Sequence, residues 1–315
     1  MKYRQLGDSG LKVSAVGLGT NQFGGKVSQE EVNEILAMSA DCGVNFIDTA
    51  DIYQGGASEA AIGEALEGKR GDFVIATKVG LRSGAGPNDG GASRKHIMDS
   101  VQRSLCRLRT DHIDLYQVHA WDDVTPTEET LRALDDLVTE GKVRYVGVSN
   151  WNAWQLCLGV SLAQMNGWVR VASVQPHYNL LVRGVEEELI PCCEYFGVGV
   201  IPYFPLAGGF LTGKYRKDEA APKGSRGEDS EYVQNFLADR YYDAIEELEE
   251  YAGVQGFSPT QLAIAWLLAQ PQVASVISGV TSLQHLEENV GAANWNMSYE
   301  EERKIRGMVE RVLRG

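Results

Sequence analysis

The sequence has few cysteines, no excess of positive charge and no long apolar run. Five cysteines occur in 315 residues, and none has the C-x-x-C spacing of zinc or redox sites. We therefore expect reduced thiols, no metal site and a cytoplasmic protein. The formal net charge of -14 at pH 7 argues against binding to the phosphate backbone of DNA or RNA. A membrane span needs about 18 consecutive apolar residues, and no segment approaches that length.

Several familiar motifs are also absent. No G-x-G-x-x-G follows an early strand, so a Rossmann dinucleotide fold has no support. There is no G-x-x-x-x-G-K-[ST] phosphate loop and no G-x-S-x-G hydrolase elbow. No H-E-x-x-H or similar histidine cluster indicates a metal. Residues 1–7 lead directly into a structured segment without an apolar core, so no secretion signal is expected.

The chain instead alternates short apolar runs with longer amphipathic segments. The predicted strands are 13–18, 44–48, 73–78, 113–119, 143–149, 171–175, 197–203 and 273–278. The predicted helices are 28–42, 58–67, 93–108, 127–140, 152–164, 186–196, 242–251 and 282–292. Apolar strands alternating with helices indicate a parallel sheet covered on both faces. Eight such units predict an α/β protein, a (β/α)8 TIM barrel forming one domain over residues 1–315.

Three segments fall outside the alternation. Residues 3–12, with a Gly-Asp-Ser-Gly turn at 7–10, predict a β-hairpin that caps one end of the barrel. Residues 206–240 form a long insertion after the seventh strand, which would place it over the mouth of the barrel. A disordered linker is the alternative interpretation of this insertion. Residues 259–269 and 299–313 are predicted as extra helices near the C-terminus.

Asp48, Tyr53 and Lys78 follow two neighbouring predicted strands. A free phenol holds its proton to about pH 10, and a free lysine to about 10.4. A buried ammonium tethered by a carboxylate would favour the phenolate and make the tyrosine a usable acid. The three residues together indicate a proton-delivery site, although each one alone is better explained as an ordinary loop residue.

Barrel chemistry occurs at the carboxyl ends of the strands, and polar groups gather at those positions here. The seven ends are Gly19-Thr20, Asp48 with Tyr53, Lys78, His119, Ser149-Asn150, Gln175 and Tyr203. His119 could be a core histidine, but beside Tyr53 it could donate a hydrogen bond to a substrate carbonyl. His96, His112 and His177 lack such neighbours and are interpreted as structural.

Together these motifs resemble the aldo-keto reductase family along essentially the whole chain. The matching segments are Gly17-Leu-Gly-Thr20, Phe46-Ile-Asp-Thr-Ala-Asp-Ile-Tyr53, 141–150, 203–214 and 278–289. The style is similar to the bacterial oxidoreductases and potassium-channel β subunits of that family. The resemblance implies a catalytic tetrad of Asp48, Tyr53, Lys78 and His119, in which Tyr53 donates the proton.

The resemblance also implies a site for NADPH or NADP+. Its implied residues are Gly19, Thr20, Asp48, Ser149, Asn150, Gln175, Tyr203, Phe204, Pro205, Leu206, Gly208, Leu211, Lys214, Arg226, Gly279, Thr281, His285, Glu288 and Asn289. Ser149, Asn150 and Gln175 would bind the carboxamide, and Tyr203 would stack on the nicotinamide. The adenosine end would lie at the start of the last barrel helix, where unpaired N–H groups favour phosphate.

One departure concerns the 2′-phosphate. Many relatives carry a lysine or arginine within the segment that is 279–285 here, and this segment contains neither. Lys214 or Arg226 could substitute, so NADPH is favoured and NADH stays possible. Phe23 and Trp121 are predicted to contact an apolar part of the substrate, with plain packing as the alternative.

The implied activity is reversible reduction of an aldehyde or ketone to an alcohol. One alternative is a regulatory, redox-sensing subunit that holds NADP(H) with slow turnover. A second is a barrel lyase or isomerase acting on phosphorylated substrates, which would have no nicotinamide clamp. The sequence does not indicate the oligomeric state.

Overall fold

The structure is a computed structural model that describes residues 1–314. Its centre is a parallel sheet of eight strands in the order β10-β3-β4-β5-β6-β7-β8-β9. The strands are β3 (Val16–Gly19), β4 (Phe46–Asp48), β5 (Val74–Val79), β6 (Ile113–Val118), β7 (Val143–Ser149), β8 (Val171–Gln175), β9 (Gly199–Val200) and β10 (Val276–Gly279). A parallel bridge between Val200 and Val273 joins the two edges and closes the sheet. The predicted (β/α)8 barrel is confirmed.

Helices follow the strands and surround the barrel. They are α1 (Gln29–Asp41), α2 (Ala57–Ala65), α3 (Arg94–Arg107), α4 (Thr127–Thr139), α5 (Ala153–Asn166), α6 (Leu189–Phe196) and α10 (Leu283–Gly291). Local sequence determines several of their ends. Capping boxes start α1 at Ser28 and α5 at Asn152, and left-handed glycines end α5 and α6 at Gly167 and Gly197.

The predicted N-terminal hairpin is present, formed by β1 (Tyr3–Gln5) and β2 (Lys12–Ser14). Its Leu6 and Val13 are fully buried in a cluster with Phe46 and Leu115, so the hairpin seals the amino ends of the strands. The predicted strand 13–18 was wrong in extent, because its first residues belong to the hairpin and only Val16–Gly19 enters the barrel. Periodicity could not show this break, since the hairpin and barrel segments are both buried.

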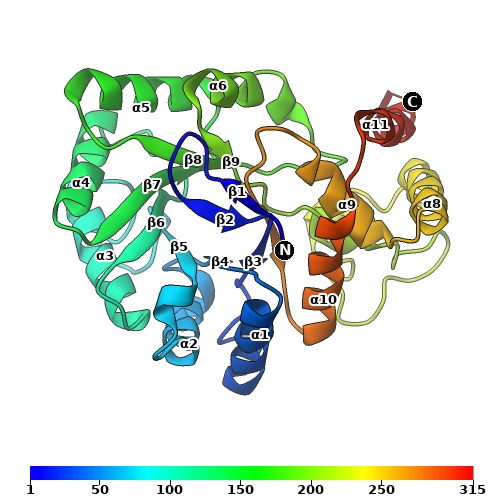
Figure 1. Ribbon diagram of the computed structural model, residues 1–315, viewed down its shortest axis with the longest axis horizontal. Helices are drawn as coiled ribbons and strands as arrows, with labels where there is room; N and C mark the ends of the chain where they lie inside the picture. Colours follow the sequence, from blue (N-terminus) through cyan, green and yellow to red (C-terminus); the bar gives the residue numbers. More distant parts are fainter. Residues whose placement is uncertain (315) are drawn as a thin grey trace.

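The segment after β9 differs from the prediction in one respect. Helix α9 (Pro259–Leu268), predicted as an extra helix, packs beside α10 and β10 in the barrel ring. Helices α8 (Asp239–Val254) and α11 (Tyr299–Arg314) instead pack against each other outside the ring (Figure 1). The reason lies in their surfaces, because α9 is apolar on nearly all sides while α8 buries only one face.

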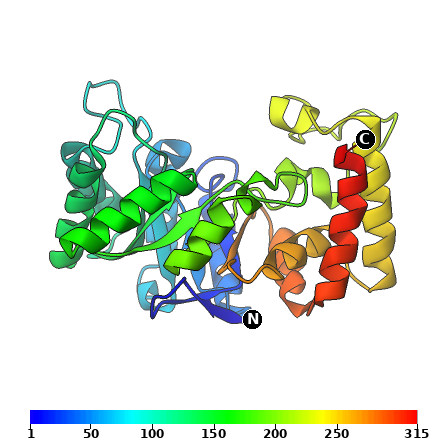
Figure 2. The ribbon, with the colours of Figure 1, turned by 90° about the horizontal axis from the view of Figure 1, so that it is seen from above.

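The long insertion after β9 is ordered. It contains a 3-10 turn, η4 (Ala207–Thr212), and the short helix α7 (Glu231–Gln234). Its Phe210 is buried and contacts Tyr215 and Phe236 ring to ring. Figure 2 shows α7 on the side of the barrel opposite the hairpin, at the carboxyl ends of the strands. No helix within residues 1–314 is long and apolar enough to span a membrane.

Candidate active site

Lys78 lies at the centre of the polar groups in the barrel. Its Nζ donates hydrogen bonds to Asp48 Oδ2 at 2.6 Å, to the carbonyl of Thr49 at 2.9 Å and to the hydroxyl of Tyr53 at 3.3 Å. The lysine side chain is fully buried and Asp48 is nearly so. Strands β4 and β5 are adjacent, which brings a carboxylate and an ammonium 30 residues apart into one pair.

Two glutamines hold Asp48 from the opposite side. Gln175 Nε2 donates to Asp48 Oδ1 at 2.8 Å, and Gln117 Nε2 donates to the same oxygen at 3.3 Å. Charge-assisted hydrogen bonds of this kind are stronger than neutral ones. Both carboxylate oxygens are therefore satisfied, and Asp48 keeps its position inside the barrel. Gln117 was not predicted as a site residue, because it lies within β6 rather than at its end.

The pKa values of Tyr53 and Lys78 reflect burial and mutual charge. Burial raises the pKa of Tyr53, and the nearby Lys78 only partly offsets this effect. Lys78 therefore lowers the pKa of Tyr53 as expected, but desolvation of the phenolate outweighs this effect, so the net pKa is raised. Burial also opposes the charge of Lys78, but Asp48 and Tyr53 together outweigh it and raise the pKa of Lys78. At neutral pH Tyr53 is protonated and Lys78 is charged.

His119 faces Tyr53 across the cavity. The two rings meet edge to face, with centroids 5.9 Å apart and planes at 76°. Burial and then the charge of Lys78 lower the pKa of His119 to about 3. The imidazole is therefore neutral across the physiological range. It can donate a hydrogen bond without acting as an acid.

Asn150 links the histidine to the next strands. Its Nδ2 donates to the carbonyl of His119 at 2.9 Å, and its Oδ1 accepts a hydrogen bond from the Tyr203 hydroxyl at 2.9 Å. Ser149 Oγ donates to the carbonyl of Gln175 at 2.9 Å. The side-chain nitrogen Nε2 of Gln175 is bonded to Asp48. The side-chain oxygen Oε1 is therefore the group that Gln175 can offer to a ligand. Ser149, Asn150, Gln175 and Tyr203 thus lie together beside the tetrad.

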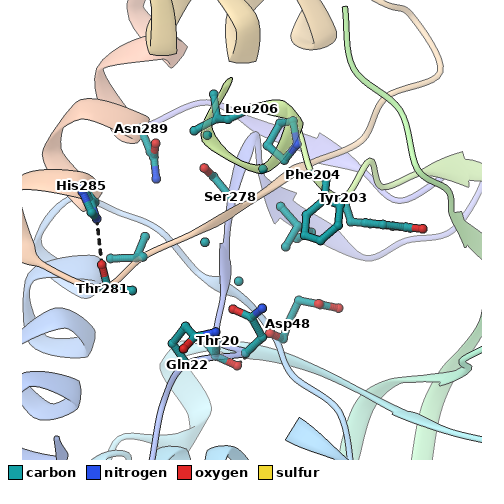
Figure 3. Close-up of a pocket in the computed structure, with 18 of the residues that line it drawn as sticks. Thr20, Gln22, Asp48, Tyr203, Phe204, Leu206, Ser278, Thr281, His285 and Asn289 are labelled. Carbon is teal, nitrogen blue, oxygen red and sulfur yellow. Dashed lines mark hydrogen bonds between the residues drawn. The ribbon is translucent and has the colours of Figure 1, made fainter. Parts of the chain in front are cut away.

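A cavity of about 630 Å³ opens above these groups. Figure 3 shows residues from β3 and β4, from the loop after β9 and from α10 around the same opening. The predicted residues that line it are Gly19, Thr20, Asp48, Tyr53, His119, Ser149, Asn150, Gln175, Tyr203, Phe204, Pro205, Leu206, Gly208, Lys214, Arg226, Gly279, Thr281, His285, Glu288 and Asn289. One cavity therefore collects side chains from positions 19 to 289 of the chain.

The far end of the cavity is formed by α10. Thr281 Oγ1 and His285 Nδ1 lie 3.0 Å apart (Figure 3). Ser282 caps the helix. The Nδ2 atom of Asn289 and the Oγ atom of Ser278 are buried and have no hydrogen-bond partner. Buried polar atoms without partners are costly, so these two atoms indicate a polar ligand at this end.

Two cations border the cavity without a carboxylate partner in the part of the chain that the structure describes. Lys214 lies over the ring of Tyr215, with Nζ 5.3 Å from its centroid. Arg226 lies over the ring of Phe204, with Cζ 5.2 Å from its centroid. Free cations at the mouth of a pocket favour an anionic ligand.

Four predicted residues do not line the cavity. Lys78 and Phe23 are fully buried, and Leu211 is 2% exposed. Trp121 contacts Trp151 and Trp154 edge to face and donates its indole N–H to Asp123 at 2.7 Å. Phe23 packs in the core and Trp121 packs against two tryptophans, while Asn21 and Gln22 line the cavity. Contact of Phe23 and Trp121 with a substrate stays a prediction.

Other residues of the cavity were not predicted as site residues. They are Thr212, Thr260, Ile277, Ser278 and Val280. Thr260 lies in the first turn of α9, a segment predicted only as an extra helix. Within residues 1–314, no group of three His, Cys, Asp or Glu side chains could hold a metal ion.

Comparison with known proteins agrees with this geometry. The model of the aldo/keto reductase family matches residues 15–310. A probable voltage-gated potassium channel subunit beta of Arabidopsis thaliana is 38% identical over 302 residues, covering 93% of this chain and 92% of that protein. Versiconal hemiacetal acetate reductase of Aspergillus parasiticus is 34% identical over 328 residues, covering 96% of this chain and 95% of that protein. With its barrel and its Asp48–Lys78 pair, the chain belongs to the aldo/keto reductase family.

Proposed function

We propose that this protein reduces an aldehyde or ketone to an alcohol with NADPH, and that Tyr53 donates the proton. The observation that carries the proposal is the contact of Tyr53 with the buried Lys78–Asp48 pair at the bottom of a large cavity. A buried phenol next to an ammonium can give up a proton because the resulting phenolate is stabilised by the positive charge.

The residues around the cavity fit a nicotinamide dinucleotide. Its volume of about 630 Å³ lies in the usual range for small-molecule sites. Gln175 and Ser149 offer acceptor oxygens to a carboxamide, and Tyr203 offers a ring for stacking. At the other end, the unpartnered Asn289 amide and the N-terminus of α10 would hold the adenosine half. The loop from Pro205 to Gly209 would follow the pyrophosphate.

A reduced nicotinamide held by these residues would supply hydride to the carbonyl carbon. The chain's own groups would perform four tasks. His119, neutral at physiological pH, donates a hydrogen bond that orients the carbonyl oxygen. Tyr53 protonates that oxygen as it becomes an alkoxide, and Lys78 stabilises the phenolate left behind. Asp48 holds Lys78 in place and balances its charge.

The direct test measures oxidation of NADPH and of NADH with a panel of aldehydes and ketones, and the reverse reaction with sugar and secondary alcohols. We expect turnover with at least one carbonyl compound and quenching of protein fluorescence by NADPH. A barrel lyase or isomerase would show neither response. Absence of both would contradict the proposal.

A second candidate function follows from the name of the Arabidopsis thaliana relative, a probable voltage-gated potassium channel subunit beta. A regulatory subunit would hold NADP(H) firmly and turn over slowly. The complete set of Tyr53, Lys78, Asp48 and His119 favours catalysis. Steady multiple turnover of a simple aldehyde would separate the two functions.

Lys214 is expected to distinguish NADPH from NADH. Replacing it with alanine removes a cavity cation without a carboxylate partner in the described residues, and should raise the Kd for NADPH about tenfold, as for loss of one charge-assisted contact. The Kd for NADH should change little. Fluorescence titration with both nucleotides measures this, and Lys223→Ala is a control because Lys223 does not line the cavity. Equal weakening of both would place Lys214 at the pyrophosphate instead.

A further inference from the structure

His177 supports Tyr203 from outside the cavity. The two rings are stacked, with centroids 5.3 Å apart and planes at 19°. Tyr203 lines the cavity and His177 does not. The position of the Tyr203 ring, which would contact the nicotinamide, therefore depends on the histidine that stacks on it.

The hydrogen bonds of His177 define its protonation state. Its Nε2 lies 2.8 Å from the Tyr232 hydroxyl and 3.3 Å from Asn179 Nδ2. The orientation of the Asn179 amide follows from its oxygen, which accepts the backbone N–H groups of Leu181 and Val182 at 2.9 and 3.0 Å. The amide nitrogen can only donate, so His177 Nε2 must accept. His177 is consequently neutral and carries its proton on Nδ1.

Tyr232 belongs to the long insertion, and its hydroxyl contacts His177. It stacks on Phe204, with centroids 5.5 Å apart and planes at 27°. A Cβ atom at Gly208 would lie 2.6 Å from the side chain of Val233, so α7 rests directly on the glycine loop. Arg226 covers the ring of Phe204. We call residues 226–233 the strap, because they lie against the loop 204–209, which lines the cavity.

We propose that the hydrogen bond from Tyr232 to neutral His177 fastens the strap over the cavity, and that protonation of His177 releases it. Nucleotide would then dissociate faster as the solution becomes acidic. The inference rests on the proposed function, because it assumes that NADPH occupies this cavity. It adds a positioning residue and a pH response, since His177 acts through Tyr203 and Tyr232.

The surroundings of His177 favour the neutral ring. Its contacts within residues 1–314 are with uncharged groups, namely Tyr203, Phe204, Tyr232 and Asn179. A charged group beside this set is Arg226, which lies over Phe204 and acts on Tyr232. Burial lowers the pKa of His177. Because the folded pKa is lowered, the stability that the neutral contacts of His177 contribute is complete above about pH 6.5. It is lost as the pH falls through the folded value.

The test is the rate of NADPH release measured by stopped-flow fluorescence at pH 7.5 and 5.5. The wild-type rate should rise at the lower pH. Tyr232→Phe keeps the ring on Phe204 but removes the hydroxyl, and should raise the rate at pH 7.5 about 3- to 10-fold, the effect of one neutral hydrogen bond. His177→Phe keeps a ring against Tyr203 and should abolish the difference between the two pH values. Tyr195→Phe is the control, because Tyr195 is 84% exposed and should behave as wild type.

Unchanged release rates in both variants would refute a role for the Tyr232–His177 hydrogen bond in holding the strap. They would leave the proposed function intact. If the wild type binds no nicotinamide nucleotide, the proposed function fails. The role of the Tyr232–His177 hydrogen bond is then tested by the mobility of the strap in the nucleotide-free protein. Trypsin cleavage after Arg226 in the nucleotide-free protein should then be faster in Tyr232→Phe than in the wild type at pH 7.5. Equal cleavage rates would show that this hydrogen bond does not hold the strap.

Discussion

Replacing Tyr53 with phenylalanine is expected to lower the rate of carbonyl reduction by about 10²- to 10⁴-fold, the usual contribution of a positioned general acid. The substitution removes one oxygen and keeps the ring that meets His119 edge to face. The affinity for NADPH should stay nearly constant, because the variant retains the cavity. Steady-state kinetics with one aldehyde and a parallel fluorescence titration with NADPH make the comparison.

Tyr299→Phe provides the matched control, since Tyr299 is 74% exposed and does not line the cavity. It should retain wild-type kcat and KM. Turnover that survives in Tyr53→Phe would assign the proton to another group. Loss of NADPH binding in the same variant would show that the phenol has a structural role.

Asp48→Asn is expected to have the second largest effect, on stability as well as activity. The fully buried Lys78 would lose its counter-ion. The new amide nitrogen would also face N–H donors, either Lys78 or the side chains of Gln175 and Gln117, and could accept from none of them. Breaking one side of a buried ion pair typically costs about 3–5 kcal/mol. The urea unfolding midpoint should fall clearly, and aldehyde reduction should be lost. Asp99→Asn, in an exposed pair with Lys95, should leave the midpoint nearly unchanged.

The double variant Asp48→Asn, Lys78→Met separates stability from chemistry. Replacing both partners of a buried pair with groups of similar volume is often close to neutral. The double variant should therefore regain much of the unfolding midpoint lost in Asp48→Asn. It should stay inactive, because no ammonium remains beside Tyr53. An equally unstable double variant would contradict the view that the unpaired lysine causes the loss.

Much of the fold was predictable because the strands alternate with helices, and several helices begin at a Ser or Asn cap or end at a glycine. Helix α5 illustrates this, since the Asn152 cap and Gly167 mark its two ends. The assignments of α8 and α9 were exchanged because both read as helices. Only their packing shows that the all-apolar α9 belongs to the barrel ring and that α8 pairs with α11.

The site was predictable where residues follow strand ends and unpredictable where contacts cross between strands. Gln117 lies inside β6, and only the closed barrel directs its amide toward Asp48. Phe23 adjoins Asn21 and Gln22 in sequence, yet it is buried while they line the cavity. His177 was interpreted as structural because Tyr232, its partner, lies 55 positions away.

The sequence by itself determined the barrel, the family resemblance and the identity of the Asp48, Tyr53, Lys78 and His119 set. These properties depend on local periodicity and on motifs within short segments, which a linear chain displays directly. The tertiary structure alone decided the direction of the Tyr53 pKa, the orientation of Asp48 and the attachment of the long insertion to His177. Each of these depends on desolvation and on hydrogen bonds between residues distant in sequence, and such terms exist only once the strands have closed around them.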